Sequence, residues 1–205
     1  MWRHLPLAGA VLLVVIAAVV RPLIHRLRHG SFGVLLFSSR SPAQIVRDLL
    51  LVTLAGTLIW QAWGAARRPP QTWVAETLGE GPLLDLMQIA GAAIMFAGIL
   101  LLAVSQLNLG ASWRIGIDES TRPGLVTSGL YRLSRNPIYL GLLTTIAGYT
   151  LLLPTPLSLF LLVGTYAGVR LQTRAEEAYL LRTYGEEYRA YEARVGRFLP
   201  RLRRR

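Results

Sequence analysis

Long apolar runs, separated by arginine-rich connectors, are the feature that most constrains the fold of this chain. Residues 5–20, 45–63 and 83–109 form runs close to or above the length that a helix needs to cross a bilayer. Backbone polar groups in lipid must be satisfied within the chain, and the alternating pattern of membrane strands is absent from the sequence. The sequence therefore predicts an all-α integral membrane helical bundle.

The first run allows two interpretations. Small residues at Ala17 and Ala18 suit a cleaved signal peptide, whereas arginines at both ends and the further apolar runs favour an uncleaved span. We expect the uncleaved span, ended by Arg21-Pro22. The apolar segment 31–39 is too short to span, and we expect either a loop with an apolar patch or an interfacial segment.

Two shorter apolar runs, residues 138–153 and 157–169, flank a Pro-Thr-Pro sequence and predict a tight helical hairpin. The second helix is expected to continue as a polar helix to about Tyr184. Gly185 interrupts it, and a further short helix is expected over residues 186–195.

About five membrane helices follow from these runs. We divide the chain into an N-terminal three-span region, residues 1–109, and a core of loop, hairpin and helical tail, residues 110–205. No Rossmann domain is expected, because neither strands nor a glycine-rich GxGxxG fingerprint occur.

All 22 basic residues are arginine, and the net charge is +11. Because the arginines flank apolar runs, they indicate anionic lipid headgroups rather than nucleic acid as the partner. Nineteen of them lie in the 21–47 connector, the 110–136 loop and the tail from residue 170. This bias predicts an integral protein of the bacterial inner membrane with its N-terminus outside and the loop and tail together in the cytoplasm.

Several kinds of chemistry are excluded by residue types. The chain has no cysteine, so disulfides and thiolate metal sites cannot form. His25 and His29 are better explained as a basic surface than as a metal site, and we expect no metal. Neither a GxSxG nor a GxxxxGK motif occurs. Any ligand must therefore be held by helix ends, aromatic rings and a few charges.

The segment GLVTSGLYRLSRNPIYLG, residues 124–141, concentrates groups suited to a ligand. Its glycines free the backbone to wrap a small molecule. Asn136 is the expected N-cap and Pro137 the first residue of a helix whose start would attract a carboxylate. Tyr131 and Tyr139 would stack on a flat ring or face a cation. A capped helix with interfacial tyrosines explains the same residues equally well.

Beyond the last apolar run, Glu176 and Glu177 follow Arg170 and Arg174. These residues form either solvated ion pairs or a carboxylate site for a cationic ligand. Tyrosines recur at helical spacing in the short helix that follows, which favours packing of the tail against the loop over a pocket; they are Tyr184, Tyr188 and Tyr191.

The sequences LVTSGLYRLSRNPIYLG and EEAYLLRTYGEEYRAYEARVGRFLP resemble the isoprenylcysteine carboxyl methyltransferase family, to which phospholipid N-methyltransferases are related. The family pattern is LVTSGxYxxxRHPxYxG followed, after a hairpin, by EExxLxxxFGxxYxxYxxxVxRxxP, and the likeness covers about residues 107–200. It implies S-adenosylmethionine bound between loop and tail. It also implies methyl transfer to a lipid-like acceptor, such as the carboxylate of an isoprenylcysteine-type compound or another amphiphile.

The resemblance also implies roles for individual residues. Glu176 would anchor the cationic end of the donor, and Arg170 or Arg174 would orient an anionic acceptor. The family often has histidine where Asn136 stands and arginine where Gln172 stands. The implied donor contacts are Gly124, Leu125, Val126, Tyr131, Asn136, Pro137, Ile138, Tyr139 and Glu176.

Two alternatives from other classes stay open at this point. A membrane reductase of related helical architecture would bind a nicotinamide cofactor. A non-catalytic lipid-binding protein would bind neither that cofactor nor S-adenosylmethionine.

Overall fold

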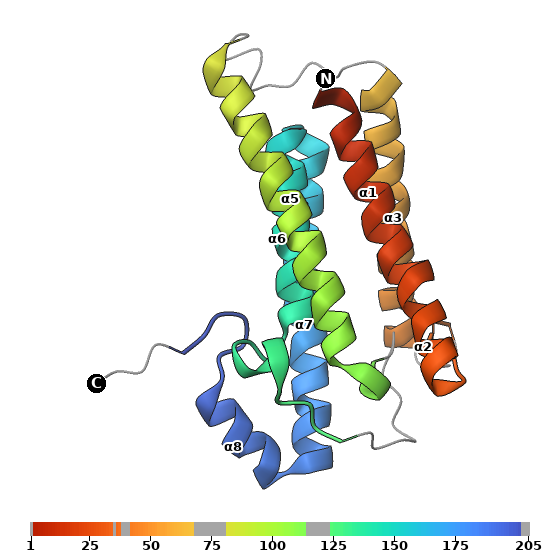
Figure 1. The fold of residues 1–205 in the computed structure, drawn as a ribbon, viewed down its shortest axis with the longest axis vertical. Helices are drawn as coiled ribbons and strands as arrows, with labels where there is room; N and C mark the ends of the chain where they lie inside the picture. Colours follow the sequence, from red (N-terminus) through yellow and green to blue (C-terminus); the bar gives the residue numbers. More distant parts are fainter. Residues whose placement is uncertain (1, 35, 38–41, 68–80, 114–123, 202–205) are drawn as a thin grey trace.

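The structure, a computed structural model, describes residues 2–34, 36–37, 42–67, 81–113 and 124–201. Its long helices run side by side along one axis, and a shorter helix folds back beneath one end (Figure 1). No β-strand occurs in these described segments. The predicted all-α membrane bundle is therefore confirmed.

The first span is longer than its apolar run. Helix α1, Leu5–Val15, continues through a π-helical turn, Ile16–Val20, into α2, Arg21–His29. The prediction that Arg21-Pro22 ends this span is wrong. The wider π turn precedes the proline, which cannot donate to the helical ladder, and the helix passes it without a break. It ends at Gly30, whose φ of 77° is left-handed.

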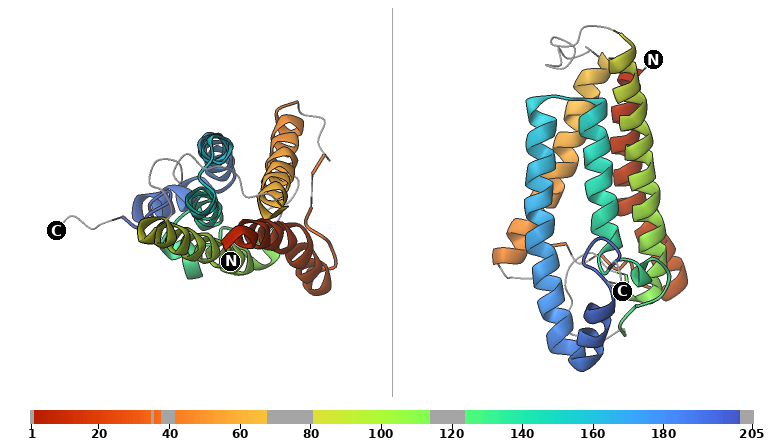
Figure 2. Two further views of the ribbon diagram at one scale, coloured as in Figure 1. Left: turned by 90° about the horizontal axis from the view of Figure 1, so that it is seen from above. Right: turned by 90° about the vertical axis from the view of Figure 1, so that its left-hand side faces the viewer.

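Of the five or so membrane helices expected, three in the described part of the chain are long and apolar enough to cross a membrane: Leu5–His29, Gln44–Arg67 within α3, and α5. The fourth apolar run forms a shorter apolar helix, Pro137–Leu152. Helix α3 runs from Pro42 to Arg67 and α5 from Pro82 to Asn108. Seen from above, α1 lies beside both α3 and α5 (Figure 2).

The Pro-Thr-Pro sequence forms the predicted hairpin turn between α6, Pro137–Leu152, and α7, Pro156–Tyr184. Thr155 caps α7, because its side chain accepts from Ser158 N while the Ser158 hydroxyl accepts from Thr155 N. The hairpin turn stops short of the outer end of α5 (Figure 2).

Glycines allow α5 and α6 to pack with their backbones almost in contact. A Cβ added at Gly91 would lie 2.6 Å from Leu152 N, and one at Gly141 would lie 2.6 Å from Leu102 N. In lipid, where burial of apolar surface gives little driving force between helices, such close approach is a main source of association. These contacts show that the glycines of α5 and α6 serve packing rather than filling lipid-facing surface.

A buried arginine joins the first span to the end of α5. Arg21 donates from Nε to the Gln106 carbonyl (3.1 Å) and from Nη2 to the Gly110 carbonyl (2.8 Å), and its guanidinium lies over the Trp113 ring. A cation at these carbonyls complements the negative end of the helix dipole. The contact fixes the point from which the chain leaves α5.

Helix α7 continues past its apolar run to Tyr184, the chain turns at Gly185, and α8 covers Glu186–Arg194. These bounds agree with the sequence prediction to within a residue or two. Helix α8 and residues 124–136 lie at one end of the bundle, and the N-terminus lies at the other (Figure 1).

We predict that Gly148→Val destabilises the protein because the new side chain would clash with the backbone of Met95 in α5. Overpacking of this kind costs about 2 kcal/mol, enough to lower the Tm in detergent by roughly 5 °C. Gly164→Val in α7 is the matched control, because nothing lies within 4 Å of a Cβ built there. Equal losses in the two variants would contradict the packing role.

Candidate functional site

The loop before α6, residues 124–136, and the arm after α7, residues 185–201, are joined by backbone hydrogen bonds. Arg135 N donates to Gly196 O at 2.9 Å, and Asn136 N donates to Arg197 O at 3.1 Å. The Tyr191 hydroxyl donates to the Tyr131 carbonyl at 2.7 Å. The prediction that loop and tail meet on one side of the bundle is therefore confirmed.

Tyrosines of α8 form the core of this junction. Tyr188 and Tyr191 are buried with Val195, and Leu125 from the loop packs against them. Burial raises the pKa of both hydroxyls to about 12. The tyrosine repeat thus serves packing, as its spacing indicated.

Glu177 is the centre of a buried polar network at the same junction. It is 8% exposed and accepts from Arg197 Nε at 3.0 and 3.1 Å and from Arg197 Nη2 at 2.5 Å. Arg135 Nη1 lies 3.4 Å from the same carboxylate and donates to Glu192 at 2.7 Å. The Glu177 carboxylate raises the pKa of Arg197. A buried carboxylate needs such cations, because an unpaired charge would be expensive at this depth.

Asn136 belongs to this network rather than to the cap of α6. It occupies the N-cap position, but its side chain makes no capping bond. Its amide instead donates to Glu177 Oε1 and to the Arg197 carbonyl, both at 3.2 Å. The predicted N-cap position of Asn136 is therefore confirmed, but the hydrogen bonds of its amide nitrogen hold the side chain in the Glu177 network, and its oxygen accepts no bond from the first turn of α6.

Glu176 faces a different set of partners. The Tyr139 hydroxyl donates to Glu176 Oε1 at 2.5 Å, and Gln172 Nε2 donates to the same oxygen at 2.6 Å. Arg47 Nη1, from the start of α3, donates to Gln172 Oε1 at 3.0 Å. Burial raises the pKa of Glu176, while the two hydrogen bonds and the Arg47 charge act against that rise. The sequence reasoning thus paired Tyr139 and Glu176 in one site, and the structure brings them into contact.

The remaining predicted residues differ in their exposure. Tyr131 and Pro137 are buried, whereas Leu125, Val126 and Ile138 are half-buried. Gly124 is exposed with a φ of 92°, a left-handed conformation that suits glycine.

The predicted arginines of α7 point elsewhere. Arg174 is exposed, and the Arg170 guanidinium lies 6.0 Å from the Tyr166 ring centroid. Within the described residues, the guanidinium whose charge acts on the Glu176 carboxyl belongs to Arg47. Sequence reasoning missed this residue because a charge at the start of a span was attributed to the headgroup region. The cost of charge within a span was the signal that could have identified it.

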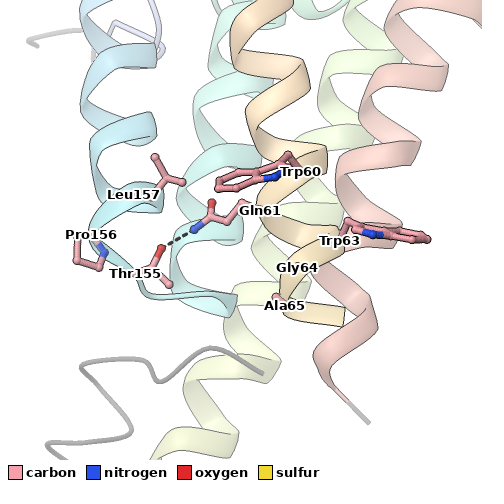
Figure 3. A pocket seen from close by; sticks show the side chains of 8 residues that line it. All are labelled: Trp60, Gln61, Trp63, Gly64, Ala65, Thr155, Pro156 and Leu157. Atoms are coloured by element: carbon pink, nitrogen blue, oxygen red, sulfur yellow. Dashed lines mark hydrogen bonds between the residues drawn. The ribbon is translucent and has the colours of Figure 1, made fainter. Parts of the chain in front are cut away.

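A cavity of about 510 Å³ opens between α3 and the hairpin turn, at the opposite end of the bundle (Figure 3). Its polar contact is Gln61 Nε2 donating to Thr155 Oγ1 at 2.5 Å. Because its walls are otherwise mainly apolar, it lacks the converging charges that mark a reactive site. It is lined by Trp60, Gln61, Trp63, Gly64, Ala65, Thr155, Pro156 and Leu157. We therefore place the candidate site at Glu176.

Comparisons with known proteins point to one group. A family model described as phospholipid methyltransferase matches residues 86–187. The chain is similar to a methanethiol S-methyltransferase of Pseudomonas deceptionensis, with 28% identity over 176 residues, which are 80% of this chain and 62% of that protein.

Two protein-S-isoprenylcysteine O-methyltransferases are also similar. The Rattus norvegicus protein is 29% identical over 137 residues, 63% of this chain and 48% of the relative. The Saccharomyces cerevisiae protein is 38% identical over 77 residues, 37% of this chain and 32% of the relative. The matched segments thus span less than two thirds of each of these three relatives.

We predict that Glu177→Gln loosens the arm, because it leaves the buried Arg135 side chain and the half-buried Arg197 side chain without the Glu177 carboxylate. Breaking a buried pair from one side costs about 3 kcal/mol, so hydrogen exchange of the α8 amides should accelerate strongly. Glu186→Gln is the control, since the Glu186–Arg189 pair is exposed and surface pairs contribute little. Unchanged exchange in the Glu177 variant would show that the network does not hold the arm.

Proposed function

We propose that this protein transfers a methyl group from S-adenosylmethionine to a lipid-like acceptor. The chain belongs to the family of integral membrane methyltransferases that includes the phospholipid and isoprenylcysteine carboxyl methyltransferases. One observation supports this most directly. The arm folds over the loop, and the Tyr139 hydroxyl at the start of α6 donates to Glu176 Oε1 in the C-terminal part of α7 at 2.5 Å.

The residues present fit this donor. S-adenosylmethionine has a sulfonium, an amino acid end that carries both an ammonium and a carboxylate, and a flat purine ring. We assign its ammonium to the Glu176 carboxylate, whose Oε1 is oriented by Tyr139 and Gln172. The backbone of residues 124–126 and the ring of Tyr131 lie on the loop that would cover the purine.

Methyl transfer from a sulfonium needs little acid–base catalysis by the protein. When bound, S-adenosylmethionine supplies an electrophilic methyl group that already carries a good leaving group. The chain's task is to align donor and acceptor and to exclude water. The clasp of Glu177 with Arg197 and Arg135 serves exclusion, because it closes the arm over the loop.

We place the site at the cytoplasmic surface, with the N-terminus outside and an acceptor entering sideways from the bilayer. The excess of arginine at the site end of the sequence supports this orientation. Two relatives are named for O-methylation of isoprenylcysteine and one for S-methylation of methanethiol. We favour a carboxylate on an amphiphile, because the site lies between the start of the apolar helix α6 and the polar C-terminal part of α7.

Donor binding tests the assigned site. Glu176→Gln should weaken binding of S-adenosylhomocysteine about 10- to 100-fold, because a charge-assisted hydrogen bond is lost. Tyr139→Phe should weaken it less, since it removes only one bond to Glu176. The measurement is titration calorimetry in detergent, with Glu187→Gln, an exposed carboxylate of α8, as control. Unchanged affinity in both site variants would remove the proposed pocket.

Methyl transfer tests the acceptor class. We expect radiolabelled methyl groups to enter the organic phase of a total lipid extract in the presence of the protein. A carboxyl ester should release the label as methanol in mild base, whereas a thioether or an amine should retain it. Label found only in the aqueous phase would contradict a lipid-like acceptor.

A further inference from the structure

We propose that Arg47 of α3 is a positioning residue of the donor site, which orients the Gln172 amide toward Glu176 and supplies the balancing positive charge. The inference rests on the proposed function, because it concerns the carboxylate assigned to the donor. It goes beyond that function by recruiting a helix that lies outside the matched residues 86–187.

A chain of hydrogen bonds crosses three helices at the site end of the bundle. Arg47 Nη1 in α3 donates to Gln172 Oε1 in α7 at 3.0 Å. Gln172 Nε2 then donates to Glu176 Oε1 at 2.6 Å, and Tyr139 of α6 donates to the same oxygen at 2.5 Å. In Figure 1 the first turns of α3 lie at the same end as the C-terminal half of α7.

The amide of Gln172 has two faces of opposite character. Its oxygen only accepts hydrogen bonds, and its nitrogen only donates them. With the amide reversed, the oxygen would face the Glu176 carboxylate and the nitrogen would face the Arg47 guanidinium, so both contacts would be repulsive. The arginine therefore selects the orientation in which Gln172 donates to Glu176.

The charge of Arg47 matters because the other groups around Glu176 do not stabilise its ionised form by charge. Glu177 on α7 repels a second negative charge, and Tyr139 on α6 and Tyr131 on the loop are neutral hydroxyls. Burial raises the pKa of Glu176, and Arg47 opposes that rise. Only the ionised carboxylate attracts an ammonium, so loss of Arg47 should confine binding to higher pH.

The position of Arg47 within α3 supports its role in the donor site. Arg47 lies in the first turns of a helix whose following residues are apolar enough to cross a membrane. Charged residues in such helices are expensive and are retained where they pair. Its Nη1 is directed across to α7, so the pairing is between helices rather than within one.

The test is titration calorimetry of S-adenosylhomocysteine in detergent from pH 5 to pH 9. Binding by the wild-type protein should weaken as pH falls and Glu176 takes up a proton. In Arg47→Met the midpoint of this acidic limb should move upward by about one pH unit, because an opposite charge near a carboxyl lowers its pKa by that order. Below both midpoints the variant should bind about tenfold more weakly.

Three controls make the outcome decisive. Arg182→Met removes an exposed charge from the same α7 helix and should leave the limb in place. Arg47→Lys keeps the charge and should restore the wild-type limb. Methylthioadenosine lacks the amino acid end, so its binding should not respond to Arg47→Met.

The possible failures are distinct. If the wild-type protein binds no S-adenosylhomocysteine at any pH, the proposed function fails. If it binds but the limb of Arg47→Met coincides with the wild-type limb, this inference fails, even where the variant has a lower Tm. If the pH dependence of binding by Arg47→Lys coincides with that of Arg47→Met, the inference also fails.

Discussion

The buried carboxylate of Glu177 is the interaction on which the rest of the site depends. Its cations come from the two segments that must meet: Arg135 precedes α6, and Arg197 follows α8. The backbone bonds between residues 135–136 and 196–197 run beside it, and the α8 tyrosines pack behind it. Separating a buried carboxylate from its guanidinium partners leaves unpaired charges, which costs far more free energy than breaking a neutral contact. The clasp therefore fixes the arm over the loop more firmly than apolar packing of so short a helix would.

The membrane helices determine where this clasp can form. Close glycine packing of α5 against α6 fixes the start of α6, and Arg21 fixes the end of α5 through the carbonyls of Gln106 and Gly110. The loop between α5 and α6 is thus held at both ends by rigid helices. Its central residues, 114–123, lie outside the described part of the chain. A site built from helix ends rather than from a sheet needs this kind of support, because its backbone is not held by a ladder of hydrogen bonds.

Much of this architecture could be predicted from the sequence, because membrane helices are set by length and composition. The hairpin, the end of α7 at Gly185 and the packing role of the α8 tyrosines followed from apolar runs, proline, glycine and helical spacing. Predictions failed where a tertiary partner competed with a local rule. Pro22 did not end the first span, because a π turn precedes it. Asn136 occupies the predicted N-cap position of α6, but its side chain bonds to Glu177 and the Arg197 carbonyl and makes no capping bond. The link from Arg47 to Gln172 joins residues 125 positions apart, and spacing along one chain gives no signal for such a pair.

Two adjacent carboxylates on one helix can have separate tasks because successive residues point about 100° apart around its axis. Glu177 faces the arm and is paired with arginines, so it is fully occupied in holding the structure together. Glu176 faces α6 and α3 and receives hydrogen bonds from a tyrosine and an amide, neither of which neutralises its charge. Its negative charge is therefore oriented without being consumed by a direct ion pair. Under the proposed function this arrangement leaves the carboxylate available for the ammonium of the donor, with the Arg47 guanidinium one amide away on α3.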